Sequence, residues 1–251
     1  MRYFKAIARI VLVVSVLALV ILAMVKIPQR RCDTILVNAH TQNECTLLTQ
    51  ADVERMLADK GIEIIGKRIK DVDLTEVTSV LERNPYIKNI NFIHFSGTRL
   101  LIDYDLRHLV LHVFDQEGGQ YFVDEDGVLV PYTGKMKDYL IVANGNIAQT
   151  YKKGAVVKGD LQQVLNVTRK IMADEFYLAQ FRQIYLNDKH QMELVASLGN
   201  QIILFGTEEN ADEKLSNLKV VYKEGLSRKG FDTYAMLDAR YKNRVIAKRM
   251  K

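Results

Sequence analysis

The sequence predicts an α+β protein with a single N-terminal transmembrane helix, a β-α-α-β-β module and a larger β-rich domain with two helices. Three observations support this prediction. An apolar run near the N-terminus is long enough for a membrane helix, helical and strand periodicities are mixed along the remaining chain, and many strand patterns are separated by short turns. Short turns join antiparallel strands, so most strands should form hairpins, which is typical of the α+β class.

The apolar run covers residues 10–25, which contain no charged side chain. With its flanking residues Arg9 and Lys26 the run gives roughly 27 Å of helix, close to the ~30 Å hydrocarbon core of a bilayer. A cleavable signal peptide is the alternative, but the run does not end in an Ala-x-Ala site. We therefore expect a transmembrane anchor at 10–27, preceded by a short cytoplasmic tail at 1–9.

The orientation of this anchor does not follow from charge counting, because basic residues lie on both sides of it. Long soluble domains are translocated largely regardless of flanking charge. We expect the N-terminus in the cytoplasm and the body of the protein outside. Arg30 and Arg31, which follow the anchor, are expected to be ordinary stop-transfer charges rather than ligands of lipid headgroups.

The composition beyond the anchor is that of an ordinary globular chain. Charged residues make up 26% and apolar residues 48% of the sequence, and the net charge is +5. Basic residues are dispersed except near the C-terminus, and no basic stripe with interleaved aromatic residues is visible. We therefore expect no nucleic-acid binding.

The chain has 2 cysteines, Cys32 and Cys45, just after the anchor. In an oxidising compartment they can form a disulfide, which would contribute up to about 3 kcal/mol of stability. Two buried thiols are the equally ordinary alternative, and the sequence leaves both open. Neither cysteine, with His40 between them, matches the spacing of a zinc site, so no metal is expected.

The first module begins with a strand at 34–38 and continues with two helices. Thr49 should begin the first helix, because Asp52 three residues later completes a short capping box. Asp73 should begin the second helix, and Pro85 should prevent it from continuing. The expected order is therefore one strand followed by two helices.

Two strand patterns complete the module, at 87–95 and 98–107, on either side of a Ser-Gly turn. In the second strand apolar residues alternate with Asp103, Asp105 and Arg107. One face of this sheet should therefore be polar, wet and available to a partner.

The second half of the chain predicts a β-rich domain with two long helices, capped by Asp160 and Asn210. Its first hairpin should turn at Asp124, Asp126 and Gly127, because Asp-Gly favours tight hairpin turns. The expected strands lie at 120–123, 128–130, 139–143, 183–186, 192–196, 201–205, 233–238 and 244–248.

No catalytic motif is present. The sequence lacks a phosphate-binding glycine loop, a Gly-x-Ser-x-Gly motif and a His-Glu-x-x-His motif. Asp124, Glu125 and Asp126 are candidates for a metal cluster or a glycosidase pair, but their place in a turn favours solvated turn residues. His108 and His112 lie in a strand pattern and are expected to be packed or exposed strand residues. We expect no enzyme activity, cofactor or small-molecule substrate.

Several segments, in this order along the chain, resemble motifs of the bacterial FtsQ family, called DivIB in Gram-positive bacteria. Leu-Glu-Arg-Asn-Pro-Tyr-Ile at 81–87 resembles the end of the second helix of that family's POTRA domain. The hairpin at 121–131 is similar to the family's Tyr-x-x-Asp-x-x-Gly-x-x-x-Pro pattern. Phe205-Gly206 followed by Lys214-Leu215, and Leu-Asp-Ala-Arg-Tyr at 237–241, resemble family patterns in the variety found in Bacteroidetes-type bacteria.

The resemblance implies a POTRA-like domain at 28–112 and an FtsQ-type β domain at 113–251. It also implies a scaffold of the division machinery, anchored in the inner membrane with a periplasmic body and located at the division septum. FtsB and FtsL would be direct partners, and the POTRA-like domain would serve further division proteins. Two departures from the family are visible: residues 106–109 replace its Glu-Arg-x-Pro segment, and the chain has no Trp.

The last strand pattern is the candidate site for FtsB, whose contact in the family lies at the C-terminal strands. A strand at a sheet edge carries unpaired backbone groups, which an extended partner can pair by β-augmentation. Basic side chains on such an edge discourage random pairing and can also select an acidic partner. The candidate partner-binding residues are Tyr234, Tyr241, Lys242, Arg244, Val245, Ile246 and Lys248.

A membrane-anchored enzyme acting on envelope glycan or peptide is the alternative to a scaffold. Its catalytic carboxylates would be chosen from Asp124, Glu125, Asp126 and Asp238. A POTRA-bearing export factor is a third hypothesis, but such proteins normally continue into a membrane barrel, and no such segment follows here.

Overall fold

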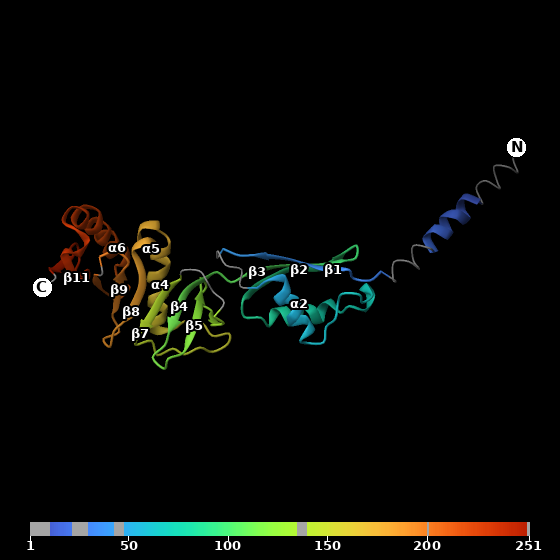
Figure 1. The fold of residues 1–251 in the computed structure, drawn as a ribbon, viewed down its shortest axis with the longest axis horizontal. Helices are drawn as coiled ribbons and strands as arrows, with labels where there is room; N and C mark the ends of the chain where they lie inside the picture. The colour runs from blue at the N-terminus through green and yellow to red at the C-terminus, as the bar shows by residue number, and fades with distance from the viewer. Residues whose placement is uncertain (1–10, 22–29, 43–47, 135–139, 200, 250–251) are drawn as a thin grey trace. The chain divides into compact units, whose positions relative to one another are not determined.

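The computed structural model of the protein describes residues 11–21, 30–42, 48–134, 140–199 and 201–249 (Figure 1). Contacts divide the chain into two units, with the boundary between Leu106 and Arg107. The predicted boundary after His112 falls inside strand β4 (Leu109–Phe114), which pairs with a strand of the second unit along each edge. Because a strand cannot be divided from its own sheet, β4 is part of the second unit.

Residues 11–21 form an exposed helix within the predicted anchor. Residues 1–10 and 22–29, which include the tail and both ends of the anchor, lie outside the described residues. Within the described ranges, no helix combines the length and the apolar character needed to cross a membrane.

The first unit has the predicted β-α-α-β-β order. In its three-stranded sheet, with order β1-β3-β2, the central strand β3 is parallel to β1 and antiparallel to β2. Figure 1 shows α2 beside this sheet. The elements are β1 (Thr34–His40), α2 (Gln50–Ala58), the short 3-10 helix η2 (Ile69–Asp71), α3 (Leu74–Glu82), β2 (Ile87–Ser96) and β3 (Arg99–Leu106).

Both helices of the first unit begin where the sequence predicts. The Thr49 hydroxyl accepts the N–H of Asp52 at 3.3 Å, and the Asp52 carboxylate accepts the N–H of Thr49 at 3.1 Å, which completes the capping box. The Asp73 carboxylate accepts the N–H groups of Thr75 and Glu76. The helices pack on the sheet through side chains that are at most 1% exposed: Val53, Leu57, Val77, Leu81, Leu100, Ile102 and Tyr104.

The polar face of β3 is less open than predicted. Asp103 is only 6% exposed, because its carboxylate accepts hydrogen bonds from Asn91 at 2.8 Å and Asn38 at 2.6 Å and also contacts the His40 ring at 3.1 Å. These hydrogen bonds, led by that of Asn91, lower the pKa of Asp103. The side chains of the two flanking strands therefore cover the centre of this face, which corrects the expectation of a wet surface.

The second unit is built on one nine-stranded sheet, with order β12-β11-β10-β9-β8-β7-β4-β5-β6. Most neighbouring strands are antiparallel, but β4–β7, β7–β8 and β10–β11 are parallel. Besides β4, its strands are β5 (Gln120–Asp124), β6 (Leu129–Pro131), β7 (Ile141–Gly145), β8 (Phe181–Leu186), β9 (Met192–Ala196), β10 (Ile202–Gly206), β11 (Tyr234–Asp238) and β12 (Ile246–Arg249).

Helices supply the other half of the second core. Buried residues of α4 and α6 pack with those of the strands in one cluster, which includes Leu165, Phe181, Phe205 and Leu218. The sequence pattern does not predict the short helix α5, which Asp174 caps at the N–H of Phe176. The helices are α4 (Gly159–Met172), α5 (Glu175–Gln180), α6 (Ala211–Val220), the π-helical η3 (Val221–Leu226), α7 (Ser227–Lys229) and the 3-10 helix η4 (Phe231–Thr233).

Of the two predicted caps of the second unit, Asp160 is wrong, and Asn210 is right in position but makes no capping hydrogen bond. Asp160 lies inside the first turn of α4, and its carboxylate contacts the ring of His190 at 2.7 Å instead of capping the helix. Asn210 occupies the N-cap position of α6, but its φ of 54° is left-handed and its side chain makes no capping hydrogen bond. A contact with His190, distant in sequence, thus replaces the expected cap by Asp160, and a left-handed backbone replaces the expected side-chain cap by Asn210.

Candidate partner-binding edge

Strand β12 forms one edge of the nine-stranded sheet. It pairs antiparallel with β11, Asp238 lying opposite Ile246 and Tyr234 opposite Arg249, and no strand of the described residues pairs with its other side. All 4 residues of β12 are exposed, and Ile246 is 46% exposed. A short, exposed edge strand of this kind can accept an added strand.

The turn before β12 is held to helix α6. Asn243 adopts a left-handed conformation with φ of 59°, and its N–H donates to the Glu213 carboxylate at 2.7 Å. The Arg244 guanidinium lies over the ring of Tyr241, 5.2 Å from its centre, and Val245 packs against the core. These contacts fix the direction in which the chain enters β12.

The end of β11 carries a tight ion pair. The Arg240 guanidinium donates to both carboxylate oxygens of Asp238, at 2.9 and 2.6 Å. The hydrogen bonds from Arg240 lower the pKa of Asp238, and the same contact raises the pKa of Arg240. Gly206 allows this arrangement: its φ is 80°, and a Cβ there would lie 3.2 Å from Cγ of Arg240.

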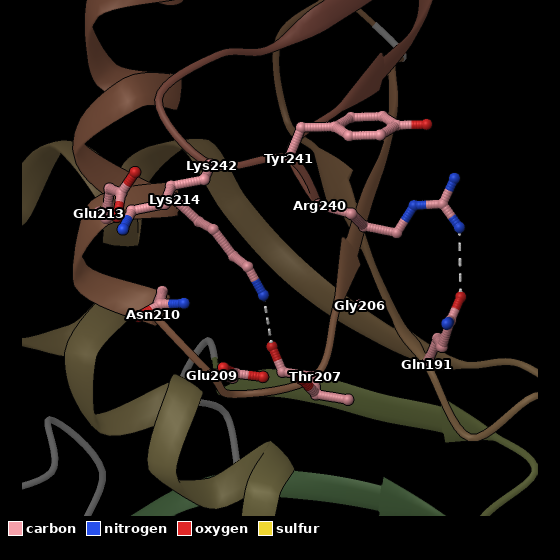
Figure 2. Close-up of a pocket in the computed structure, with 10 residues that line it drawn as sticks. All are labelled: Gln191, Gly206, Thr207, Glu209, Asn210, Glu213, Lys214, Arg240, Tyr241 and Lys242. Carbon is pink, nitrogen blue, oxygen red and sulfur yellow. Dashed lines mark hydrogen bonds between the residues drawn. The ribbon is translucent and has the colours of Figure 1, made fainter.

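Arg240 also lines a cavity of about 300 Å³. Figure 2 shows the side chains around this cavity. Lys214, from α6, is only 8% exposed, and its ammonium donates to the Thr207 carbonyl at 2.9 Å and lies 5.0 Å from the centre of the Phe205 ring. Burial lowers the pKa of Lys214. The cavity is lined by Gln191, Gly206, Thr207, Glu209, Asn210, Glu213, Lys214, Arg240, Tyr241 and Lys242.

The structure brings most of the candidate partner-binding residues together. Tyr241, Lys242, Arg244 and Lys248 are exposed around the β12 edge, as is Ile246. Val245 and Tyr234 are half-buried and pack against the core, so they hold the edge strand in place and offer little surface to a partner.

Sequence reasoning missed Lys214 and Arg240 as neighbours of this edge. Arg240 is close in sequence to the candidate residues. Lys214 is not: it lies in α6, and the chain reverses direction between β10 and this helix, which brings Lys214 near the edge. The Phe205-Gly206 pair is the only local signal for this juxtaposition, since a glycine with positive φ marks a close approach of another group.

Of the three carboxylates in the β5–β6 hairpin, Asp126 is exposed as expected and Glu125 is half-buried, whereas Asp124 is buried. The side chain of Asp124 is 1% exposed, and one oxygen accepts the N–H groups of Asp126 at 3.0 Å and Val128 at 2.7 Å. Its other oxygen accepts from Arg107 at 2.7 Å. Gly127 has a φ of 88°, and a Cβ there would lie 2.9 Å from Val157, so the turn requires glycine.

Glu125 contacts the His108 ring at 3.2 Å. The His112 ring stacks on Tyr132 and makes tilted contacts with the rings of Phe114 and Phe122. Within the ranges that the structure describes, no group of three or more His, Cys, Asp or Glu residues is arranged to hold a metal ion.

Cys32 is buried, 1% exposed, with a free thiol that contacts the Thr34 carbonyl at 3.4 Å. Burial raises the pKa of this thiol. Cys45 lies outside the described residues, so the disulfide between the two cysteines stays a prediction.

Comparison with known families agrees with this architecture. The profile of the family described as "FtsQ/DivIB, C-terminal related" matches residues 109–248, and that of the POTRA-like domain matches residues 30–103. No curated protein matches the chain. The fold is thus α+β, with a POTRA-like domain followed by a β-rich domain. The first profile matches more than half of the chain, so the chain belongs to the FtsQ/DivIB family.

Proposed function

We propose that this protein is a non-enzymatic, membrane-anchored scaffold of the bacterial division machinery. In this proposal it binds FtsB and FtsL outside the inner membrane and links early and late division proteins at the septum. Family membership supports the class of function. The observation that carries the binding mode is the exposed outer edge of β12, which no strand among the described residues pairs. An extended segment of FtsB would pair with this edge as a tenth strand.

The charge of the edge supports an acidic partner strand. Lys242, Arg244 and Lys248 are exposed around β12, and Arg249 ends the strand. Complementary charge speeds encounter and rejects wrong partners, whereas backbone pairing supplies affinity in any sequence. The proposed contacts are therefore main-chain hydrogen bonds to β12, with Tyr241 and Ile246 as apolar contacts.

The test is capture of FtsB by full-length protein in detergent. The variant Arg244→Glu/Lys248→Glu, with and without Ile246→Pro, is compared with the parent. Proline removes a backbone donor from the edge, and the charge change opposes an acidic strand. Both variants should lose most of the captured FtsB, whereas the matched control Arg228→Glu/Lys229→Glu, on α7, should capture as much as the parent. Undiminished capture by the variants, shown to be folded by circular dichroism, would exclude this edge.

The proposed anchor is residues 10–27, with the N-terminus in the cytoplasm and the body in the periplasm. Their uncharged core and the helix at 11–21 support this placement. Protease added to the periplasmic face of spheroplasts should digest the body. A body digested only from the cytoplasmic face would overturn the orientation.

We place recruitment of further division proteins on the POTRA-like unit. A deletion that tests this should remove residues 31–106, because a deletion through His112 would also remove most of β4, an interior strand of the second sheet. Loss of midcell fluorescence from the deleted fusion protein is the expected result. Normal midcell localisation would exclude this role.

The scaffold proposal also predicts the phenotype of depletion. Cells should grow into filaments with unchanged envelope chemistry, since no catalytic step is lost. Accumulation of a defined glycan or peptide substrate would instead indicate an enzyme.

A further inference from the structure

Two segments that are far apart in sequence meet at the start of the first unit. The N–H of Cys32 donates to the Lys67 carbonyl at 2.9 Å, the N–H of Gly66 donates to the Cys32 carbonyl at 2.7 Å, and the N–H of Ile69 donates to the Arg30 carbonyl at 3.0 Å. The Arg31 guanidinium also donates to the Gly66 carbonyl at 2.6 Å. In Figure 1 the loop that leads into η2 accordingly lies beside the start of β1.

This pairing gathers positive charge on one exposed surface. Segments 30–33 and 66–71 contain five cationic side chains and only two carboxylates, Asp33 and Asp71. Arg68 is paired with Asp71 at 2.6 Å, and Ile65, next to the loop, is a large apolar side chain that is 55% exposed. We call this surface the basic patch; its cations, all exposed, are Arg30, Arg31, Lys67, Arg68 and Lys70.

The position of the basic patch in the chain places it next to the proposed anchor. Arg30 is the third residue after Ile27, so the patch begins at most about 11 Å from the end of the anchor, whatever the conformation between them. An anionic membrane surface attracts basic residues over roughly a Debye length, ~8–10 Å, which flexible lysine and arginine side chains can reach. Stop-transfer charge accounts for Arg30 and Arg31, but it gives no reason for Lys67 and Lys70 to join them.

We propose that the basic patch docks the POTRA-like unit on the anionic lipid headgroups around its own anchor. Lys67 and Lys70 would contact lipid phosphates, and Ile65 would enter the interfacial region. The docking would restrict the orientation of the unit relative to the membrane. This inference rests on the anchor of the proposed function but not on the binding of FtsB.

The test uses a property of the sequence: it contains no tryptophan. Ile65→Trp therefore introduces a unique fluorophore at an exposed position beside the patch. The full chain carrying this substitution is reconstituted into nanodiscs of phosphatidylcholine with or without phosphatidylglycerol. A lipid with a nitroxide on its headgroup is included as the quencher. Quenching should be strong in anionic nanodiscs, weak in neutral ones, and reduced by 0.5 M salt.

Lys67→Glu/Lys70→Glu is the variant that tests the patch, because both lysines are exposed and, within the described residues, no side-chain hydrogen bond or ion pair is lost with either. Each basic residue near an anionic surface changes the ratio of docked to undocked molecules by about fivefold, so losing two should lower it by at least about 20-fold. The control variant Arg228→Glu/Lys229→Glu changes the net charge by the same amount, but in the second unit. Its tryptophan should be quenched as strongly as that of the parent.

Equal quenching in neutral and anionic nanodiscs, or in the patch variant and the parent, would overturn the proposal. An equal loss in the control variant would do so as well, because it would indicate net charge rather than the patch. The second expected result concerns the chain without the Ile65→Trp substitution. Mass spectrometry should show that Lys67 and Lys70 are acetylated more slowly in anionic than in neutral nanodiscs. If alkaline carbonate extracts the chain from vesicles, the anchor and this inference fail together; retained chain without lipid dependence overturns only this inference.

Discussion

Replacing Asp124 with alanine is expected to destabilise the second unit by about 3 kcal/mol. The carboxylate lies at the end of β5, where it accepts the N–H groups of Asp126 and Val128 through one oxygen and the Arg107 guanidinium through the other. Breaking a buried ion pair costs about 3–5 kcal/mol, and the lower end applies because the side chain of Arg107 keeps 19% exposure.

Asp124→Asn separates the two parts of this cost. An amide oxygen can still accept both turn N–H groups, so only the pairing with Arg107 is lost. The asparagine variant should therefore cost about 1–2 kcal/mol, and the remainder measures the two turn hydrogen bonds at about 0.5–1 kcal/mol each.

Native-state hydrogen exchange of the full chain measures these values for each unit. The slowest amides of β5 and β6 exchange through unfolding of their unit, so a loss of 3 kcal/mol should speed their exchange by about 100-fold. Amides of the first unit serve as an internal reference, and Asp188→Ala, at an exposed turn position, is the control. Acceleration below about fivefold for Asp124→Ala would refute the reasoning.

Three further substitutions test backbone and burial arguments. Gly206→Ala should cost about 1–2 kcal/mol in the same exchange measurement, because the residue is left-handed and its Cβ would press on Arg240; a change below 0.5 kcal/mol would contradict this. Gly145→Ala should cost more, since φ is 96° and its Cβ would overlap the Leu186 carbonyl; a smaller loss than at Gly206 would be the contrary result. His112 has a pKa lowered by burial, so the unfolded chain takes up its proton first and stability should fall as pH drops below about 6.5; unfolding at pH 7.5 and 5.5 should show this loss in the parent and not in His112→Phe.

Features set by neighbours in sequence were predictable. The capping box at Thr49, the cap at Asp73 and the Asp-Gly hairpin all depend on residues within four positions of each other, and the structure confirms each of them. The alternation of apolar residues similarly located most strands of both units, but it gave no separate strand for β4.

Features set by tertiary contacts were not predictable. Asp160 resembles a helix cap, but it contacts His190 from the β8–β9 turn. Asp124 resembles a solvated turn residue, but it is buried and accepts a hydrogen bond from Arg107. At the candidate site, the sequence located the final strand, yet only the parallel pairing of β10 and β11 explains why Lys214 lies near it.

The most direct test of the central claim is hydrogen exchange along β12 with and without FtsB. Strand addition pairs the outward backbone groups of Ile246–Arg249, so exchange in this segment should slow at least about tenfold when FtsB saturates the protein. The opposite edge strand, β6, should exchange at an unchanged rate. Bound FtsB that leaves exchange in β12 unchanged would contradict the account.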